Sequence, residues 1–446
     1  MSIQIYSIIG LVLIFLLATL RSVNMGAVAF LGTFLIGTFI FDESVDDLFS
    51  GFPGDLFVVL VGVTLLFAIA KANGTVDWLI QAGVRAVRGR IALIPWVMFL
   101  VTSLLTMVGA VVPGAVAIMA PIGLNFATRY RINPMLMGLL IINGASAGGF
   151  SPISIFGSIT NGVVERSGLP GNPALLWISS FLFNAVLSVV VFFLFGGKQL
   201  LRRRISTEPG APSDSDDEDV SGGPVSGPSG GTATSTKQRT TSSTEVSTLN
   251  PQRVITLAGL IVLAVGALAL EFDVGLLALS IATVICLLSP RDTKGCVAEV
   301  AWPTVLLICG VVTYVGLMER VGTIEFLGDS VAGIGVPLLA AFVICLIGAA
   351  VSAFASTTGI LGALIPLAVP FLLTGQVGAV GMIIALALSS SVVDSSPFST
   401  SGALVVASAP EQVRDTVFRK LMIWGMSMIV VAPVAACLIF VIPGWL

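Results

Sequence analysis

Long apolar runs alternate with short polar loops along most of the chain. Each run is long enough to cross the hydrocarbon core of a bilayer as a helix, which takes about 20 residues. Because a helix satisfies its own backbone hydrogen bonds in lipid, the pattern predicts an all-α polytopic membrane protein. The apolar runs cover residues 3–20, 23–41, 55–71, 92–128, 135–165, 173–196, 254–270, 274–290, 303–318, 336–373, 378–409 and 421–443.

One segment breaks this pattern and divides the chain. From residue 206 to residue 250, 28 of 45 residues are Ser, Thr, Gly or Pro, and residues 214–219 form an acidic cluster. Such a composition cannot bury a core, so it predicts a disordered linker. We expect a first membrane repeat over residues 1–197, a cytoplasmic linker over 198–252 and a second membrane repeat over 253–446.

The two apolar halves resemble each other in sequence. Residues 73–79 match residues 321–327 at an offset of 248. A second set of matches follows in the same order at an offset of 245, which indicates an internal duplication of the kind found in secondary transporters. The second set pairs Pro121, Ser151, Pro152, Ser154 and Gly157 with Pro366, Ser396, Pro397, Ser399 and Gly402.

The basic residues indicate how the halves lie in the membrane. If the runs at 92–131 and 336–373 are re-entrant hairpins, each half has five spans and the second half is inverted. With the N-terminus outside, 19 of the 21 Lys and Arg residues are then cytoplasmic, and the exceptions are Arg166 and Arg320. Full spans in place of the hairpins would put several basic clusters outside. We therefore predict two inverted repeats, each of five spans plus one re-entrant hairpin, in a plasma (inner) membrane with both termini outside.

Composition supports this class and removes several kinds of chemistry. Hydrophobic residues make up 56% of the chain and charged residues 10%, where soluble proteins carry about 25%. There is no histidine, which excludes His-ligated metals and Ser-His-Asp catalysis, and the five cysteines form no Cys-x-x-Cys pair. No nucleotide-binding Gly-rich motif occurs, and a net charge of −3 suggests no nucleic-acid partner. We expect no cofactor and no enzymatic activity.

Two spans carry sequences that are unusual for a membrane helix. Residues 143–152 and 389–401 are rich in small and hydroxylated residues, and each contains a Ser-Pro pair at repeat-equivalent positions. Because Ser and Pro favour the N-cap and the first turn, we predict helices broken at the midplane, with second half-helices starting at Pro152 and Pro397. The half-helix N-termini would favour an anion and the freed carbonyls a cation. An ordinary proline kink is the alternative.

Asp394 is the only acidic residue deep in a span. A charge there costs a few kcal/mol, which a bound cation or protonation must offset. An uncharged Asp394 bonded to nearby hydroxyls is the alternative. Its repeat partner is Gly149, so the halves differ at this point. No Lys or Arg lies deep in the spans, so binding of an anion beside Asp394 requires cation coupling.

The hairpin tips differ between the halves. The second tip, Ser356-Thr357-Thr358, offers three hydroxyls, and the equivalent Val111-Val112-Pro113 offers backbone groups only. With Pro366 and the stretches 148–154 and 393–402, these motifs resemble the ion-transporter superfamily. Within it they resemble the bacterial dicarboxylate (malonate) carrier family, related to divalent anion/sodium symporters. The resemblance covers both halves and not the linker.

The resemblance implies a homodimer in which a moving domain carries substrate past a fixed scaffold, with the site at the tips and breaks. Na⁺ near Asp394 would be the coupling ion, with H⁺ as the alternative. The candidate substrate-binding residues are Asn143, Ser151, Ser154, Ser356, Thr357, Thr358, Ser396, Ser399 and Thr400. The candidate ion-coupling residues are Val112, Pro113, Ser146, Gly149, Asp394 and Ser395.

The leading hypothesis is thus a secondary active transporter of small dicarboxylates, of the malonate or C4 type. Related transporters move citrate, sulfate or arsenite, and these anions remain alternatives. A passive anion channel is a further alternative, against which the near absence of pore-lining charge argues. An intramembrane enzyme would lack a general base other than Asp394.

Overall fold

A computed structural model describes most of the chain as helices. It describes residues 4–21, 23–86, 90–201, 250–270, 272–291, 293–323, 326, 336–353, 357–373 and 375–444. These residues contain helices and connecting turns and no strand. Most of the predicted linker, residues 202–249, lies outside the described residues. Ser356 of the second tip also lies outside them.

The first half supplies the helices up to residue 201. Its elements are α1 (Gln4–Arg21), α2 (Met25–Phe39), α3 (Val45–Ser50), α4 (Gly54–Ala72), α5 (Thr75–Ala86), α6 (Ile94–Met107), α7 (Val112–Arg129), α8 (Pro134–Gly149), α9 (Ile155–Arg166), α10 (Pro173–Leu194) and α11 (Gly197–Leu201).

The second half supplies the remaining helices and three short turns of other helical types. Its α-helices are α12 (Pro251–Ala269), α13 (Val274–Leu288), α14 (Trp302–Arg320), α16 (Pro337–Ser352), α17 (Thr357–Leu373), α18 (Ala379–Val392), α19 (Thr400–Ser408) and α20 (Glu411–Ala436). The short elements are η3 (Cys296–Glu299), η4 (Val393–Ser395) and a π-helical turn, η5 (Cys437–Val441).

Length and hydropathy make this a polytopic membrane protein. Five of the described helical segments are long and apolar enough to cross a membrane, and further apolar helices are shorter. The five are Gly54–Ala72, Pro173–Leu194, Trp302–Arg320, Ala379–Ser408 and Glu411–Val441. Many large apolar side chains on the outer faces of α1, α10 and α20 are exposed, as expected for surfaces in contact with lipid.

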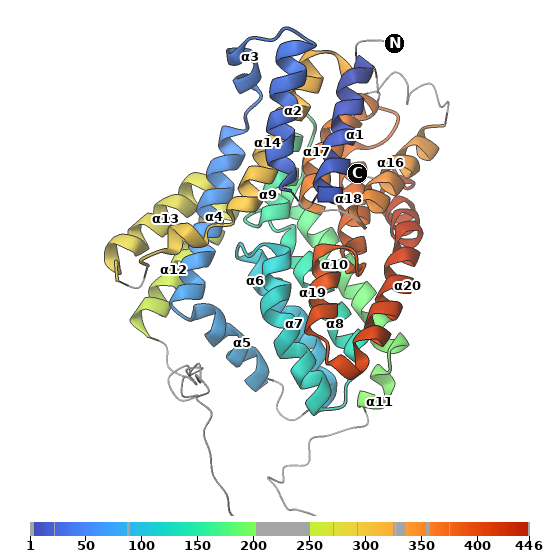
Figure 1. The fold of residues 1–446 in the computed structure, drawn as a ribbon. Coiled ribbons are helices and arrows are strands. Elements are labelled where there is room, and N and C mark those ends of the chain that lie inside the picture. The colour runs from blue at the N-terminus through green and yellow to red at the C-terminus, as the bar shows by residue number, and fades with distance from the viewer. Residues whose placement is uncertain are drawn as a thin grey trace, which may run out of the picture.

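The helices form two groups, and each group mixes the two halves of the chain (Figure 1). In the first group, which contains α1, α2, α4, α12, α13 and α14, α4 packs against α13 and α2 packs against α14. In the second group, which contains α6 to α10 and α16 to α20, α7 packs against α19 and α9 against α17. Neither half is therefore a separate domain in space.

Two pairs of consecutive helices occupy the predicted hairpin runs. α6 and α7 contact each other and are joined at residues 108–111, and α16 contacts α17. Gly109 in the first tip has a φ of 113°, which only glycine adopts readily. A Cβ at Gly109 would also lie 2.4 Å from Val63 Cγ1 on α4. Glycine therefore allows the first tip to turn tightly against the first helix group.

In three ion pairs, a basic residue at the end of a helix contacts an acidic residue in a loop, in a short helical turn or at the start of another helix. The Arg320 guanidinium donates to both carboxylate oxygens of Glu43 at 3.0 and 2.9 Å, and Lys71 Nζ lies 3.5 Å from Glu299. Arg166 Nε donates to Asp55 at 3.0 Å. Exposed pairs contribute little stability. They do neutralise Arg166 and Arg320, the two cations that the topology prediction puts outside.

Candidate functional site

Both unusual spans are broken helices. α8 ends at Gly149 and α9 starts at Ile155, while α18 and η4 end at Ser395 and α19 starts at Thr400. The prediction of breaks is confirmed, but the predicted half-helix starts at Pro152 and Pro397 are wrong by three residues. The Ser-Pro pairs lie within the turns, because a second serine three residues after the first takes the N-cap position.

The N-cap serines hold the two breaks together in the same way. Ser399 Oγ donates to the backbone carbonyls of Asp394, at 2.5 Å, and Ser396, at 2.6 Å. Ser154 Oγ donates to the carbonyls of Gly149 and Ser151. Gly149, Ser151 and Ser154 precede Asp394, Ser396 and Ser399, respectively, by 245 residues each. The Ser151 and Ser396 carbonyls also accept a backbone N–H, from Ser154 and Ser399. In both halves a serine hydroxyl therefore satisfies a carbonyl at the end of the broken helix, that of Gly149 or Asp394, which lacks a helical partner.

A glycine inside each half-helix makes this turn possible. A Cβ at Gly157 would lie 1.9 Å from the carbonyl oxygen of Ser151, and a Cβ at Gly402 would lie 1.9 Å from that of Ser396. Neither distance is compatible with a side chain. The repeat match between Gly157 and Gly402 thus reflects close approach of the backbone at the two breaks.

The breaks differ where the second half carries its acid. Asp394 is 3% exposed, and Ser401 Oγ donates to its Oδ2 at 2.5 Å. At the equivalent place in the first half, a Cβ on Gly149 would lie 3.0 Å from Val112 Cγ2 and 3.3 Å from Phe156 Cδ2. Val112 and Phe156 therefore fill the space that a carboxylate and its hydroxyl partner take in the second half.

Hydrogen bonds link the second tip to the second broken helix. Thr357 Oγ1 lies 2.9 Å from Ser352 Oγ, and Ser352 Oγ donates to the carbonyl of Ser390 at 2.7 Å. The Ser390 hydroxyl is itself buried without a hydrogen-bond partner. Thr358 is 4% exposed. The tip and the helix before the second break thus share one buried polar cluster.

The first tip meets the first break through backbone and small residues. A Cβ at Gly148 would lie 1.9 Å from the Ser103 carbonyl oxygen near the end of α6. Ser151 Oγ is 3.5 Å from the carbonyl of Met107. At Gly114, in the first turn of α7 beside Pro113, a Cβ would have only Val111 within 4 Å. The start of α7 therefore borders open space at Gly114.

Some predicted site residues make contacts elsewhere. Asn143 Nδ2 donates to Ser188 Oγ on α10 at 3.1 Å, and the Ser146 carbonyl accepts from Ser180 Oγ on α10 at 3.3 Å. Asn143 and the Ser146 backbone therefore join α8 to α10. Ser395 Oγ donates to the carbonyl of Val392 at 2.8 Å, within its own helix turn. Among the predicted side chains, that of Thr400 is exposed.

Sequence reasoning missed three residues of this polar region, namely Ser352, Ser390 and Ser401. Ser401 could have been found from its spacing. It follows Asp394 by seven residues, about two helical turns, and residues at that spacing lie on the same side. Ser352 stands in a long apolar run, and Ser390 is one of three consecutive serines in the stretch 389–401, so only the packing of α16 against α18 shows that these two meet.

Comparison with known families bears on the first of the two halves. Residues 1–149 match the family model described as "Dicarboxylate carrier protein MatC N-terminus". The resemblance to the dicarboxylate (malonate) carrier family is confirmed. The match ends at Gly149, the last residue of α8, so it includes the first tip and reaches the first break. No curated protein matches the chain.

The carrier family indicates a membrane transport protein for dicarboxylates and argues against an enzyme. This agrees with the chemistry of the described site. Its polar groups are hydroxyls, backbone groups and one carboxylate, which can bind and release ions. The described residues contain no group of three or more His, Cys, Asp or Glu side chains that could hold a metal.

Substituting either N-cap serine by alanine should destabilise the protein. Ser154→Ala leaves the buried carbonyl of Gly149 without its hydroxyl donor, and Ser399→Ala does the same to the carbonyl of Asp394, which costs about 1–3 kcal/mol in each case. We expect similar drops in apparent Tm for both variants, measured by thermal unfolding in detergent.

Ser408→Ala is the matched control, because Ser408 Oγ donates to the Leu404 carbonyl within an intact helix. Its apparent Tm should stay close to that of the original protein. Equal Tm values for all three variants would contradict the structural role of Ser154 and Ser399.

Proposed function

We propose that the chain is a secondary active transporter of small dicarboxylates, of the malonate or C4 type, coupled to Na⁺ or H⁺. The observation that carries this proposal is the match of residues 1–149 to the dicarboxylate carrier family. A dianion brought beside Asp394 repels it strongly in a low-dielectric site. Either a cation or a proton must therefore accompany the substrate, and its gradient can drive accumulation.

The proposed transporter is built from two inverted repeats. Reciprocal contacts support this arrangement, since α4 pairs with α13 of the other half and its repeat equivalent α14 pairs with α2. The same exchange relates α7 with α19 to α17 with α9. Two ion pairs show the same exchange between halves, because Lys71 at the end of α4 pairs with Glu299 and Arg320 at the end of α14 pairs with Glu43. A pseudo-two-fold axis in the membrane plane accounts for all of these pairs.

The second helix group would be the moving part of an elevator. Its contact with α4 places glycines against aliphatic side chains, with Gly109 on Val63 and Gly162 on Leu56. Such a surface is smooth and has few directional bonds that must break when it slides. The Arg166–Asp55 pair crosses the same boundary at an exposed helix end, where it costs little to open.

Within the moving part, the two tips and the two breaks would hold the cargo. The start of α7 borders open space and can offer N–H groups to a substrate carboxylate. Asp394 would attract Na⁺, since hard cations prefer carboxylate, hydroxyl and carbonyl oxygens, all of which surround this break. Thr357 and Thr358 are candidates for the second substrate carboxylate.

Charge supports an orientation with both termini outside a plasma membrane. α3, with Asp46 and Asp47, lies at the end of the molecule where the N-terminus lies, and α5 and α11 lie at the opposite end (Figure 1). The basic ends of α7 and α11 therefore point away from the acidic end, as the positive-inside rule favours. The homodimer that the family resemblance implies remains part of the proposal.

Uptake into proteoliposomes tests the function. We expect accumulation of labelled malonate or succinate when an inward Na⁺ or proton gradient is imposed, and no accumulation without a gradient. Citrate, sulfate and arsenite, offered under the same conditions, distinguish the alternative substrates. Gradient-independent equilibration of several anions would instead identify a passive channel.

Asp394→Asn should separate the two coupling modes. If Asp394 binds Na⁺, removal of a unit charge about 4 Å from the ion removes about 4 kcal/mol and should lower Na⁺ affinity on the order of a thousandfold. If it carries the proton, substrate exchange should survive while pH-driven accumulation is lost. Asp415→Asn, at an exposed acid of α20, is the matched control. Unchanged accumulation by Asp394→Asn under both gradients would leave this residue with a structural role only.

A cross-link between the two helix groups should stop transport. A Cβ at Gly162 would lie 2.6 Å from Leu56 Cδ2, so residues 56 and 162 face each other across the boundary, and cysteines at both positions are the pair to cross-link. In a variant without the five native cysteines, oxidation of Leu56→Cys/Gly162→Cys should abolish uptake, and a reductant should restore it. The two single variants should be insensitive to oxidant. Full transport by cross-linked protein would rule out movement between the groups.

A further inference from the structure

Two cavities lie one beyond the other along the seam between α10 and α20. The first is lined at one end of the seam by residues 194–200 and by residues 413–420 of α20. The second is lined by residues 175–190 of α10 and 428–440 of α20 and η5. Val190 and Leu194, at the adjoining ends, are one helical turn apart, about 6 Å. On α20 the adjoining lining residues, Lys420 and Met428, are two helical turns apart, about 12 Å, so the seam holds two separate cavities of different chemistry placed end to end.

The first part, here the basic pocket, is polar and cationic. It has a volume of about 850 Å³ and is lined by Arg131 and Lys420 together with Gln199, Thr416 and Asn133. None of the described residues that line it is acidic. The N-terminus of α8 also opens into it, since Asn133 and Pro134 are lining residues. The pocket therefore suits a compact anion with several oxygen atoms, such as a phosphate group.

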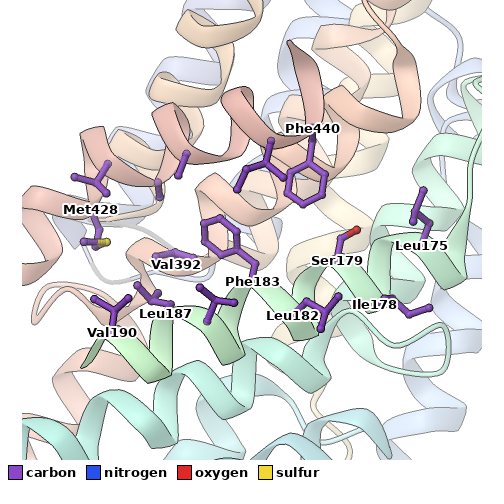
Figure 2. Close-up of a pocket in the computed structure, with 15 residues that line it drawn as sticks. Leu175, Ile178, Ser179, Leu182, Phe183, Leu187, Val190, Val392, Met428 and Phe440 are labelled. Atoms are coloured by element: carbon purple, nitrogen blue, oxygen red, sulfur yellow. The ribbon is translucent and has the colours of Figure 1, made fainter. Parts of the chain in front are cut away.

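The second part, here the apolar groove, has a volume of about 510 Å³ (Figure 2). Ser179 is the one hydroxylated residue among aliphatic and aromatic side chains that include Leu182, Phe183 and Met428. Leu182 is 58% exposed and Val186 64% exposed, so the groove wall is itself part of the surface that faces lipid. A hydrocarbon chain fits this groove without loss of any polar contact.

Aromatic side chains lie where the two parts meet. Phe195, which lines the basic pocket, packs edge-on against Trp424 with ring centroids 6.1 Å apart. Trp424 is 9% exposed, and its Nε1 is buried without a hydrogen-bond partner. Tryptophan with a polar edge is typical of the level where headgroups meet acyl chains.

We propose that this seam is a binding site for one anionic phospholipid. Its phosphate headgroup lies in the basic pocket with Arg131 and Lys420, and an acyl chain lies in the apolar groove. A free phosphate would account for the pocket alone. A second protein chain would account for the groove but not for a cationic pocket at its end. Anionic lipids are attracted to basic pockets between helices at the membrane surface.

The bound lipid would contact the helices beside the second break. Val392, the last residue of α18, lines the groove. Next to it, α20 packs so closely on the break that a Cβ at Gly425 would lie 2.7 Å from Ser396 Cα. A chain in the groove therefore contacts α18 and α20, the two helices that meet at the second break. This inference concerns binding and does not depend on which cargo is transported.

Lipid titration of the purified protein tests the proposal. Phosphatidylglycerol and phosphatidylcholine with the same acyl chains are added to the detergent-solubilised full chain, and bound lipid is counted by native mass spectrometry. We expect one phosphatidylglycerol to bind well before any phosphatidylcholine. Arg131→Gln/Lys420→Gln should weaken this binding about thirtyfold, since each cation contributes about fivefold.

Matched variants separate the two parts of the seam. Arg419→Gln removes a neighbouring charge of α20 that does not line the pocket, and it should leave binding unchanged. Ala435→Phe fills the groove and should weaken binding, while Val434→Phe, beside it but outside the groove, should not. Apparent Tm values of all variants without added lipid check that each one folds.

Three results would overturn the proposal. Equal affinity for the two lipids would remove the headgroup site. An effect of Arg419→Gln as large as that of the double variant would reduce the preference to general surface charge. Competition by excess inorganic phosphate together with normal binding to Ala435→Phe would assign the basic pocket to free phosphate.

Discussion

A helix can stop inside a membrane only if another group takes over the hydrogen bonds of its last carbonyls. Here one serine does this at each break, with Ser154 and Ser399 donating to two carbonyls apiece. The glycines three residues later let the following turn approach those carbonyls. Everything else in the described site depends on these two turns, because they position the ends of α8 and α18 beside the hairpin tips.

The same turns explain why the halves interlock. Each half-helix after a break, α9 or α19, packs against the second arm of the hairpin from the opposite half. A polar helix end in one half also meets a partner in the other, as Thr323 meets Ser7 at 2.7 Å and Asn73 meets Thr256 at 2.6 Å. Neither half can bury these groups alone, so the fold is completed only when both halves assemble.

Much of this could be predicted from the sequence, and the failures have a common physical origin. The apolar runs, the breaks and the repeat-equivalent serines were visible because they depend on local composition. The helix starts were placed three residues early because Ser-Pro is also compatible with a turn, and only the hydroxyl bonds of Ser154 and Ser399 decide between the two. Ser352 and Ser390 were missed because their partners come from helices that are distant in sequence.

The most informative feature is a difference between otherwise equivalent breaks. With Asp394 and Ser401 in the second half, the first half has Gly149 and Phe156 at the same positions, and Val112 packs into the remaining space. A carboxylate at Gly149 would require displacement of both apolar side chains. The duplicated scaffold therefore supplies two similar turns, but only one is built to carry a charge. In the proposed transporter, this single ionisable turn would hold the cation or proton that offsets the charge of a dianion.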